Sequence, residues 1–305
     1  MQFLTSKGAD VTSSLESTNA HDSSARILAE AAEILTTLYG KDLEAIYVER
    51  LIVGVFCTGV KLSSGCGGIA YTPPEAIQRA GTRILKGHNP IIRGMRACEL
   101  ISGGVPGSFS DVIRLATLNA LSVPFLNCDR YVVGTGNDVT EQSQLFIGRR
   151  ICMVGAIIPT LKRLKELGVK DVTVIDKKKE TEAEIDFGHF TPIDKTAEAL
   201  ALCETAIFTG ASIANGTIDF LISNVPENAI IVVVGPTAGF VPEPLFRRNV
   251  AIIGTGVVTD SDQALDLLSE GGGAYQLFKK CLRKINLVNP LGMSRPRQDV
   301  VRTVD

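Results

Sequence analysis

Residues 150–176 read RICMVGAIIPTLKRLKELGVKDVTVID, and this stretch indicates the fold. Arg150–Val154 is a short apolar run that predicts a buried strand. Pro159–Leu167 predicts a helix, because proline is favoured in the first turn of a helix and Gly168 can end it with a positive φ. Asp171–Ile175 predicts a second strand. A strand, a helix and a strand in close succession are typical of a parallel sheet that carries helices on its faces.

The same alternation continues toward the C-terminus. Further strands are predicted at Thr205–Thr209, Ala229–Val234 and Val250–Gly254. Further helices are predicted at Thr196–Leu202, Gly216–Asn224, Pro244–Arg248 and Ser261–Ser269, the last clear one. We therefore expect an α/β fold with a Rossmann-like parallel sheet domain over residues 126–305.

The first part of the chain has a different pattern. Residues 24–40 have apolar side chains at helical spacing, whereas Ala45–Val53, Val55–Leu62 and Gly67–Tyr71 predict antiparallel strands. After Pro73, a stretch that we expect to be poor in helix leads to a second helix at Ser108–Leu121. This order predicts a small α+β domain over residues 25–125, preceded by a flexible N-terminus, residues 1–24.

The composition argues against several classes of partner. The 305 residues carry a net charge of −2, so a broad basic surface for nucleic acid is not expected. The sequence contains neither a long uncharged apolar run nor a signal-peptide pattern in residues 1–25, so we expect no membrane span. The seven cysteines are scattered, without a C-x-x-C pair, as in reduced and mostly buried thiols. We therefore expect a cytoplasmic protein, and leave a homo-oligomer open.

Glycine and small polar residues follow the predicted parallel strands, where ligands bind in open sheets. The candidates at these strand ends are Gly155, Asp176, Thr209, Gly210, Gly235, Pro236 and Thr237. A full G-x-G-x-x-G is absent after the first strand and Pro159 removes a donor, so a standard dinucleotide site is doubtful. Asp176 lies about 20 residues beyond Gly155, where a Rossmann acidic residue holds a ribose hydroxyl. The alternative is that Asp176 is an exposed turn residue before the lysines at 177–179.

The segment Thr209–Thr217 has the highest density of polar groups. Its Ser212, Asn215 and Thr217, with Thr209 itself, offer hydroxyls and an amide that can hydrogen-bond a ligand. The alternative is helix capping by Ser212 or Asn215. Capping accounts for one of these side chains rather than four, so we favour a binding role.

Metal-ligating patterns are weak. The three histidines, His21, His88 and His189, are far apart and none has metal spacing. Cys57 and Cys66 flank a predicted hairpin turn and could face each other, although core or edge thiols are the favoured interpretation. We assign neither metal ligands nor catalytic residues from these patterns.

A set of motifs carries a family resemblance. The motifs are VFCTGV (55–60), GGIAYT (67–72), LATLNAL (115–121), Val154-Gly155, TGASIANGT (209–217) and GPT (235–237). In their order and spacing, over about residues 25–280, the chain resembles a heavy-metal chelation family of unknown function. The resemblance implies an enolase-N-terminal-like domain followed by a Rossmann-like domain.

The resemblance also implies a site between the two domains. Carried over to this chain, it places Asn119 opposite Gly155, Thr209, Gly210, Asn215, Thr217 and Thr237; a buried amide bonded to nearby backbone is the equal alternative for Asn119. The loop 210–217 lacks an acidic residue, so Asp138 is the best spare carboxylate.

Three functions follow from these observations. The first is metal handling, with a metal or a small metal chelate bound between the domains and a divalent metal ion as the suggested cofactor. The second is an enzyme that acts on a small heterocyclic or nucleotide-like molecule of the pterin, flavin-precursor or S-adenosylmethionine type, which the polar strand ends and Asp176 favour. The third is a non-catalytic scaffold or sensor.

Overall fold

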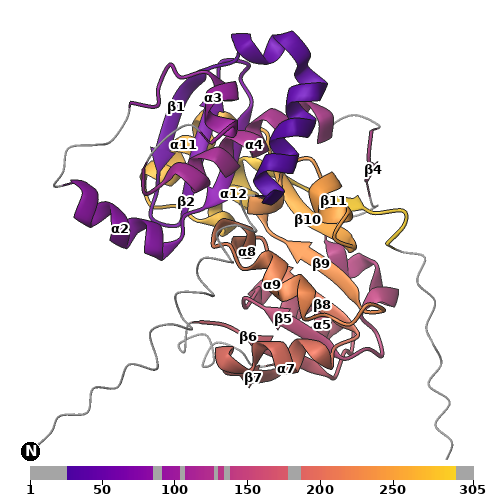
Figure 1. The fold of residues 1–305 in the computed structure, drawn as a ribbon. Helices are drawn as coiled ribbons and strands as arrows, with labels where there is room; N and C mark the ends of the chain where they lie inside the picture. The colour runs from indigo at the N-terminus through magenta and orange to yellow at the C-terminus, as the bar shows by residue number, and fades with distance from the viewer. Residues whose placement is uncertain are drawn as a thin grey trace, which may run out of the picture.

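The computed structural model describes residues 26–84, 91–103, 107–126, 130–133, 138–177 and 187–292. These residues form two sheets (Figure 1). One is a three-stranded antiparallel sheet near the N-terminus, in the order β1-β2-β3. The other has eight strands, in the order β4-β11-β10-β9-β8-β5-β6-β7, and is mostly parallel. The predicted α/β fold class is confirmed.

The large sheet has the strand order of a doubly wound Rossmann fold. Its six parallel strands are β5 (Ile151–Val154), β6 (Val172–Ile175), β7 (His189–Thr191), β8 (Thr205–Thr209), β9 (Ile230–Val234) and β10 (Val250–Val258). Numbered along the chain, these strands follow the order 3-2-1-4-5-6 across the sheet. β11 (Leu282–Val288) pairs antiparallel with β10, and β4 (Val132–Val133) pairs antiparallel with β11.

Alternation along the strands buries both faces of this sheet. Met153, Ile207 and Val232 belong to one buried cluster, which also includes residues of the helix after β5. Phe208 and Val233 belong to another, which extends into the N-terminal part of the chain. The continuous apolar runs of the sequence follow from this two-sided burial.

The helices on and around the large sheet are mostly short. They are α5 (Ile158–Glu166), α7 (Thr196–Ala201), α8 (Ala211–Ala214), α9 (Ile218–Ser223), α10 (Glu243–Phe246), α11 (Ser261–Ser269) and α12 (Ala274–Lys280). Single 3-10 turns occur at η2 (Val139–Glu141), η3 (Ser143–Leu145), η4 (Ile193–Lys195) and η5 (Pro236–Ala238). As predicted, Gly168 follows α5 with a positive φ of 73°.

The N-terminal part begins with a helix over 26–39, the described share of the predicted helix 24–40. It continues through η1 (Gly40–Ala45), β1 (Val48–Val53), β2 (Cys57–Leu62), β3 (Gly67–Tyr71), α2 (Pro74–Ile84), α3 (Ala97–Ile101) and α4 (Ser110–Leu126). The predicted hairpin between β2 and β3 is confirmed, and Gly65 in its turn has a φ of 82°.

Several predictions about the elements were wrong. The stretch after Pro73 is not poor in helix, because α2 starts at Pro74. Proline is tolerated in the first turn, where its missing N–H would have no partner in the helix. The carboxylate of Glu75 is attracted to the positive N-terminal end of the helix dipole. The helix predicted at Gly216–Asn224 is present as α9, but the short helix α8, which ends ahead of Gly216 with its φ of 81°, was not predicted. β10 runs past Gly254 because the antiparallel β11, which the sequence analysis missed together with α12, pairs with its last residues.

Helix α11 connects the two parts of the molecule. It lies against β1 and β2 (Figure 1), on the sheet face opposite α4. Leu265 and Leu268 of α11 belong to one cluster with Cys57 and Ile69 of the small sheet. Lys61 on β2 forms an ion pair of 2.8 Å with Asp262. The domain boundary between residues 125 and 126 stays a prediction. Helix α11 lies in the predicted second domain but packs on the small sheet of the predicted first domain.

Candidate functional site

The candidate site lies where the direction of strand order reverses, between β5 and β8. Gly155 follows β5 with a φ of 85°, and a Cβ on it would lie 2.5 Å from Cγ2 of Thr209. The methyl group of Thr209 therefore packs directly against the Gly155 backbone. Two of the predicted site residues are thus in contact, and only glycine fits at position 155 without strain.

The turn after β5 is bonded within the chain. The Gly155 N–H donates to the Ile175 carbonyl at 2.8 Å, and the Ala156 N–H donates to Oδ2 of Asp176, also at 2.8 Å. The Asp176 carboxylate therefore lies against the start of the turn rather than away from it. This geometry explains why an acidic residue is accommodated at the end of β6.

The polar side chains of 209–217 bond mostly to one another and to nearby backbone. Ser212 Oγ donates to the Thr209 carbonyl at 2.7 Å. Asn215 Oδ1 accepts hydrogen bonds from the Thr217 hydroxyl at 2.8 Å and from the Thr217 N–H at 3.3 Å. Neither Ser212 nor Asn215 caps the start of α8 or α9 with its side chain, but local bonds to neighbouring residues occupy both side chains. Their role as ligand contacts stays a prediction.

The end of β9 approaches the end of β8. The Gly210 N–H donates to the Val234 carbonyl at 2.8 Å. A Cβ on Gly210 would lie 3.3 Å from Cβ of Thr237 and 3.4 Å from the Gly235 carbonyl oxygen. Gly210, Gly235 and Thr237 are therefore brought together, as the common sheet edge predicted.

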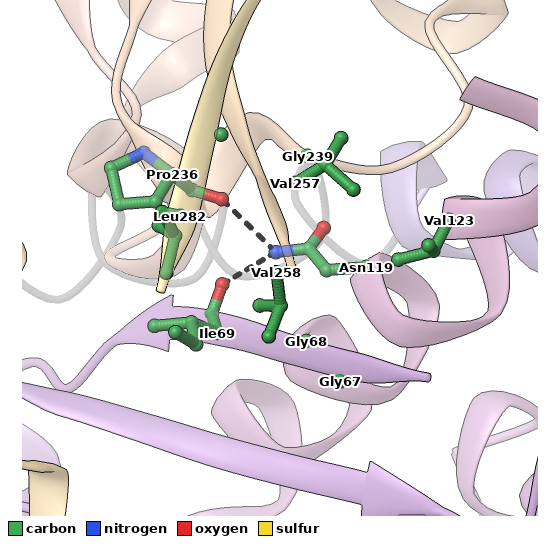
Figure 2. Close-up of a pocket in the computed structure, with 11 residues that line it drawn as sticks. Gly67, Gly68, Ile69, Asn119, Val123, Pro236, Gly239, Val257, Val258 and Leu282 are labelled. Atoms are coloured by element: carbon green, nitrogen blue, oxygen red, sulfur yellow. Dashed lines mark hydrogen bonds between the residues drawn. The ribbon is translucent and has the colours of Figure 1, made fainter. Parts of the chain in front are cut away.

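Asn119 joins the N-terminal part to this edge. Its Nδ2 donates to the carbonyls of Ile69 at 2.6 Å and Pro236 at 3.3 Å (Figure 2). It also donates to the carbonyl of Thr237 at 3.2 Å. The Tyr71 N–H adds a bond to the Thr237 hydroxyl at 3.0 Å. The predicted approach of Asn119 to Thr237 is present, and the contact is made with backbone.

The oxygen of the same amide is buried without a partner. Asn119 is 4% exposed, and its Oδ1 has no hydrogen-bond partner among the described residues. Because Nδ2 points to three carbonyls, the orientation of the amide is fixed by its neighbours. Asn119 also lines a cavity of about 10 Å³, the room that one water needs, between β3, α4, η5 and β10.

We expect Asn119→Leu to destabilise the fold by about 2 kcal/mol or more, because leucine has a similar size but cannot donate to the three carbonyls, of which those of Ile69 and Thr237 are buried. Urea denaturation measures this free energy. Ser122→Ala is the matched control, since it removes one bond between α4 and the rest of the chain, the 3.0 Å bond from the Val241 N–H, together with the 2.7 Å bond of the hydroxyl to the Leu118 carbonyl within α4, and should cost about 1 kcal/mol. Equal costs for the two variants would contradict the role given to Asn119.

Asp138 has a local role in the structure. Its Oδ1 accepts from the Thr140 N–H at 3.0 Å and from the Thr140 hydroxyl at 2.7 Å, at the start of η2. Its Oδ2 lies 3.9 Å from Nζ of Lys284 on β11. Val139, the next residue, packs on Gly254. These contacts place Asp138 beside β10 and β11, at the far side of β9 from the turn after β5.

Of the residues near Asp176, Glu75 and Tyr71 were not singled out from the sequence, and Lys177 was considered only as part of an exposed turn. Lys177 Nζ lies 3.4 Å from Oε1 of Glu75, the second residue of α2. Burial raises the pKa of Tyr71 at the end of β3, and the negative charges of Glu75 and Asp176 raise it further. Glu75 and Lys177 are 102 positions apart. No local pattern could have linked α2 to the end of β6.

The cysteines do not form the arrangement considered from the sequence. Cys57 lies opposite Tyr71 in the hairpin, whereas Cys66 lies in the turn, so the two do not face each other. Burial raises the pKa of Cys57 to about 12 and that of Cys152 to about 12. Among the described residues no group of three or more His, Cys, Asp or Glu could hold a metal ion. His21, His88, Cys128 and the lysines at 178–179 lie outside the described residues.

Comparison with known proteins identifies the family. Two family models match the chain, over residues 37–122 and 138–287, and both are described as "Putative heavy-metal chelation". The chain therefore belongs to this family, and the resemblance read from its motifs is confirmed. No match was found among curated proteins.

Two solved structures have the same fold. A protein of unknown function from Pyrococcus horikoshii has a TM-score of 0.68 and 22% identity, over 86% of this chain and 99% of that one. A protein of unknown function from Desulfitobacterium hafniense has a TM-score of 0.61 and 17% identity, over 85% of this chain and 98% of that one. At these identities the likeness shows the fold alone.

The helices are short relative to a bilayer. Within the part of the chain that the structure describes, no helix has both the length and the apolar character that crossing a membrane requires.

Proposed function

We propose that this protein handles metal by binding a small organic molecule that carries the metal ion. The proposed position is the edge where β5, β6 and β8 end, opposite Tyr71 and Glu75. The family description supplies the link to metal. The strand order 3-2-1-4-5-6 supports this position, because open α/β sheets bind ligands at the point where strand order reverses.

The observation that carries the proposal is the meeting of charged groups from both parts of the chain at this edge. Asp176 and Lys177 come from the end of β6, and Glu75 comes from α2. The Glu75–Lys177 pair is 3.4 Å long with side chains about half exposed, and such pairs contribute little stability. A ligand could therefore replace this pair at small cost.

The thiols support a chelate rather than a metal held by cysteine. Metals bind the thiolate, and burial raises the pKa of Cys203 and Cys281 to about 11, in addition to Cys57 and Cys152. At neutral pH these groups are protonated, and binding a metal ion would require each to lose its proton. A molecule that already holds the metal avoids this cost.

Native mass spectrometry of protein purified without chelator tests the proposal. We expect an adduct whose mass equals an organic molecule plus a metal ion, and expect metal analysis to find the same metal. The adduct should be lost from Asp176→Ala and kept by Asp194→Ala, which changes an exposed carboxylate on η4. Bare protein from metal-supplemented cells, or a metal ion without an organic part, would contradict the proposal.

The second candidate is an enzyme that acts on a heterocyclic or nucleotide-like molecule. Asp176 favours it, because it ends the second strand of a Rossmann order, where an acidic residue meets ribose hydroxyls in such enzymes. An organic adduct of pterin or nucleoside size without metal, in the same experiment, would replace the chelate proposal with this one.

A further inference from the structure

Three successive amide donors in the turn between β5 and α5, those of residues 155–157, are occupied by the chain itself. The Gly155 N–H bonds the Ile175 carbonyl at 2.8 Å, and the Ala156 N–H bonds Asp176 Oδ2 at 2.8 Å. The Ile157 N–H points to the sulfur of Met153 at 3.5 Å. Pro159, in the first turn of α5, has no N–H to offer.

Phosphate-binding turns of Rossmann folds depend on these donors. There, free backbone N–H groups and the positive end of the following helix hold the anion. Here the carboxylate of Asp176 accepts one of these bonds and brings a negative charge to the start of α5. An incoming phosphate would have to break the Ala156–Asp176 bond and then lie beside the displaced carboxylate.

The groups around this turn also disfavour an anionic ligand. Among the described residues in contact at this edge, Glu75 and Asp176 are acidic and Lys177 is basic, and Lys177 is already paired with Glu75. The carboxylates and the phenol of Tyr71 are acceptors for a ligand that carries hydrogen-bond donors. Metal-bound water is such a donor, because the ion polarises it strongly.

We propose that Asp176 determines the class of ligand by occupying the Ala156 amide, so that the site takes a neutral or cationic, donor-bearing molecule and no phosphate. This inference rests on the proposed position of the site. It extends the proposed function by excluding phosphorylated molecules, nucleotides included, at the turn after β5.

Titration with inorganic pyrophosphate, followed by NMR at the Ala156 amide, tests this inference. In the wild type we expect the Ala156 resonance to stay unchanged. In Asp176→Ala the freed amide should respond to pyrophosphate, with affinity at least about tenfold higher than in the wild type, because a charge-assisted bond no longer competes. Asp176→Asn keeps an oxygen that can accept the Ala156 bond, so it should gain much less.

Three results would overturn the inference. They are a response of Ala156 to pyrophosphate in the wild type, no response in Asp176→Ala, and an equal gain in Asp176→Asn and Asp176→Ala. Amide dispersion in the same spectra reports whether each variant is folded, and Asp176→Ser replaces the alanine variant if that one is not. Because pyrophosphate is the probe, the titration decides this inference even if no metal chelate is found on the purified protein.

Discussion

Gly68→Ala is expected to unfold the protein under conditions in which the wild type is folded. A Cβ on Gly68 would lie 2.1 Å from the Ala116 carbonyl oxygen, 2.3 Å from the Ala120 nitrogen and 2.9 Å from the Ala120 Cα. All three atoms belong to the backbone of α4, so no change of rotamer can relieve the overlap. β3 would have to move away from α4, and the contacts between β3 and η5 would move with it.

The expected cost exceeds about 4 kcal/mol, which places Gly68→Ala among the most damaging single substitutions. Urea denaturation and the yield of soluble protein measure it. Gly273→Ala is the control, because the nearest atom to its Cβ lies 3.8 Å away and its φ of −115° suits alanine. A Gly68→Ala variant as stable as Gly273→Ala would show that β3 does not lie this close to α4.

The sequence predicts the parallel strands well, because a strand that is buried on both faces is a continuous apolar run in the sequence. A short apolar run such as Ile230–Val234, bounded by turn residues, is typical of a buried strand. β11 could not be predicted in this way. Its first half carries exposed Arg283 and Lys284, so it lacks the apolar run of the parallel strands.

Part of the candidate site could be predicted from the topology of the sheet. Gly155, Thr209, Gly210 and Thr237 lie at the ends of three strands of one sheet, β5, β8 and β9, and their convergence needs only the rule that parallel strands end at one edge. The bond from Ala156 to Asp176 could not be predicted, because it depends on the path of the turn after β5. The approach of Glu75 depends on how α2 docks, which no periodicity encodes.

Asn119 shows the limit of interpreting a polar residue from sequence. Its position among the apolar residues of α4 predicts a buried amide, and either a ligand or backbone can satisfy one. The structure gives the nitrogen three backbone partners and the oxygen none among the described residues. The backbone alternative is therefore present at the nitrogen, whereas a ligand at the oxygen stays a prediction.

The second large effect is expected at Gly155, where two costs combine. Alanine at a φ of 85° is strained by about 1–2 kcal/mol. Its Cβ would also lie 2.5 Å from Cγ2 of Thr209, and such overpacking adds about 1–3 kcal/mol. Gly155→Ala should therefore lose about 2–5 kcal/mol of unfolding free energy and move the ends of β5 and β8 apart.

A pair of further variants separates these costs. Gly168→Ala has a similar φ of 73° and nothing within 4 Å of its Cβ, so it measures the backbone strain alone. Thr209→Ser removes Cγ2 but keeps the hydroxyl that accepts from the Ala211 N–H at 3.4 Å. Combined with Gly155→Ala, it should bring the cost part of the way toward that of Gly168→Ala, as measured by urea denaturation, because Cβ of residue 209 stays 2.9 Å from the new Cβ. If Thr209→Ser and Gly155→Ala are simply additive, the Thr209 methyl does not pack on Gly155, because residues in contact are coupled.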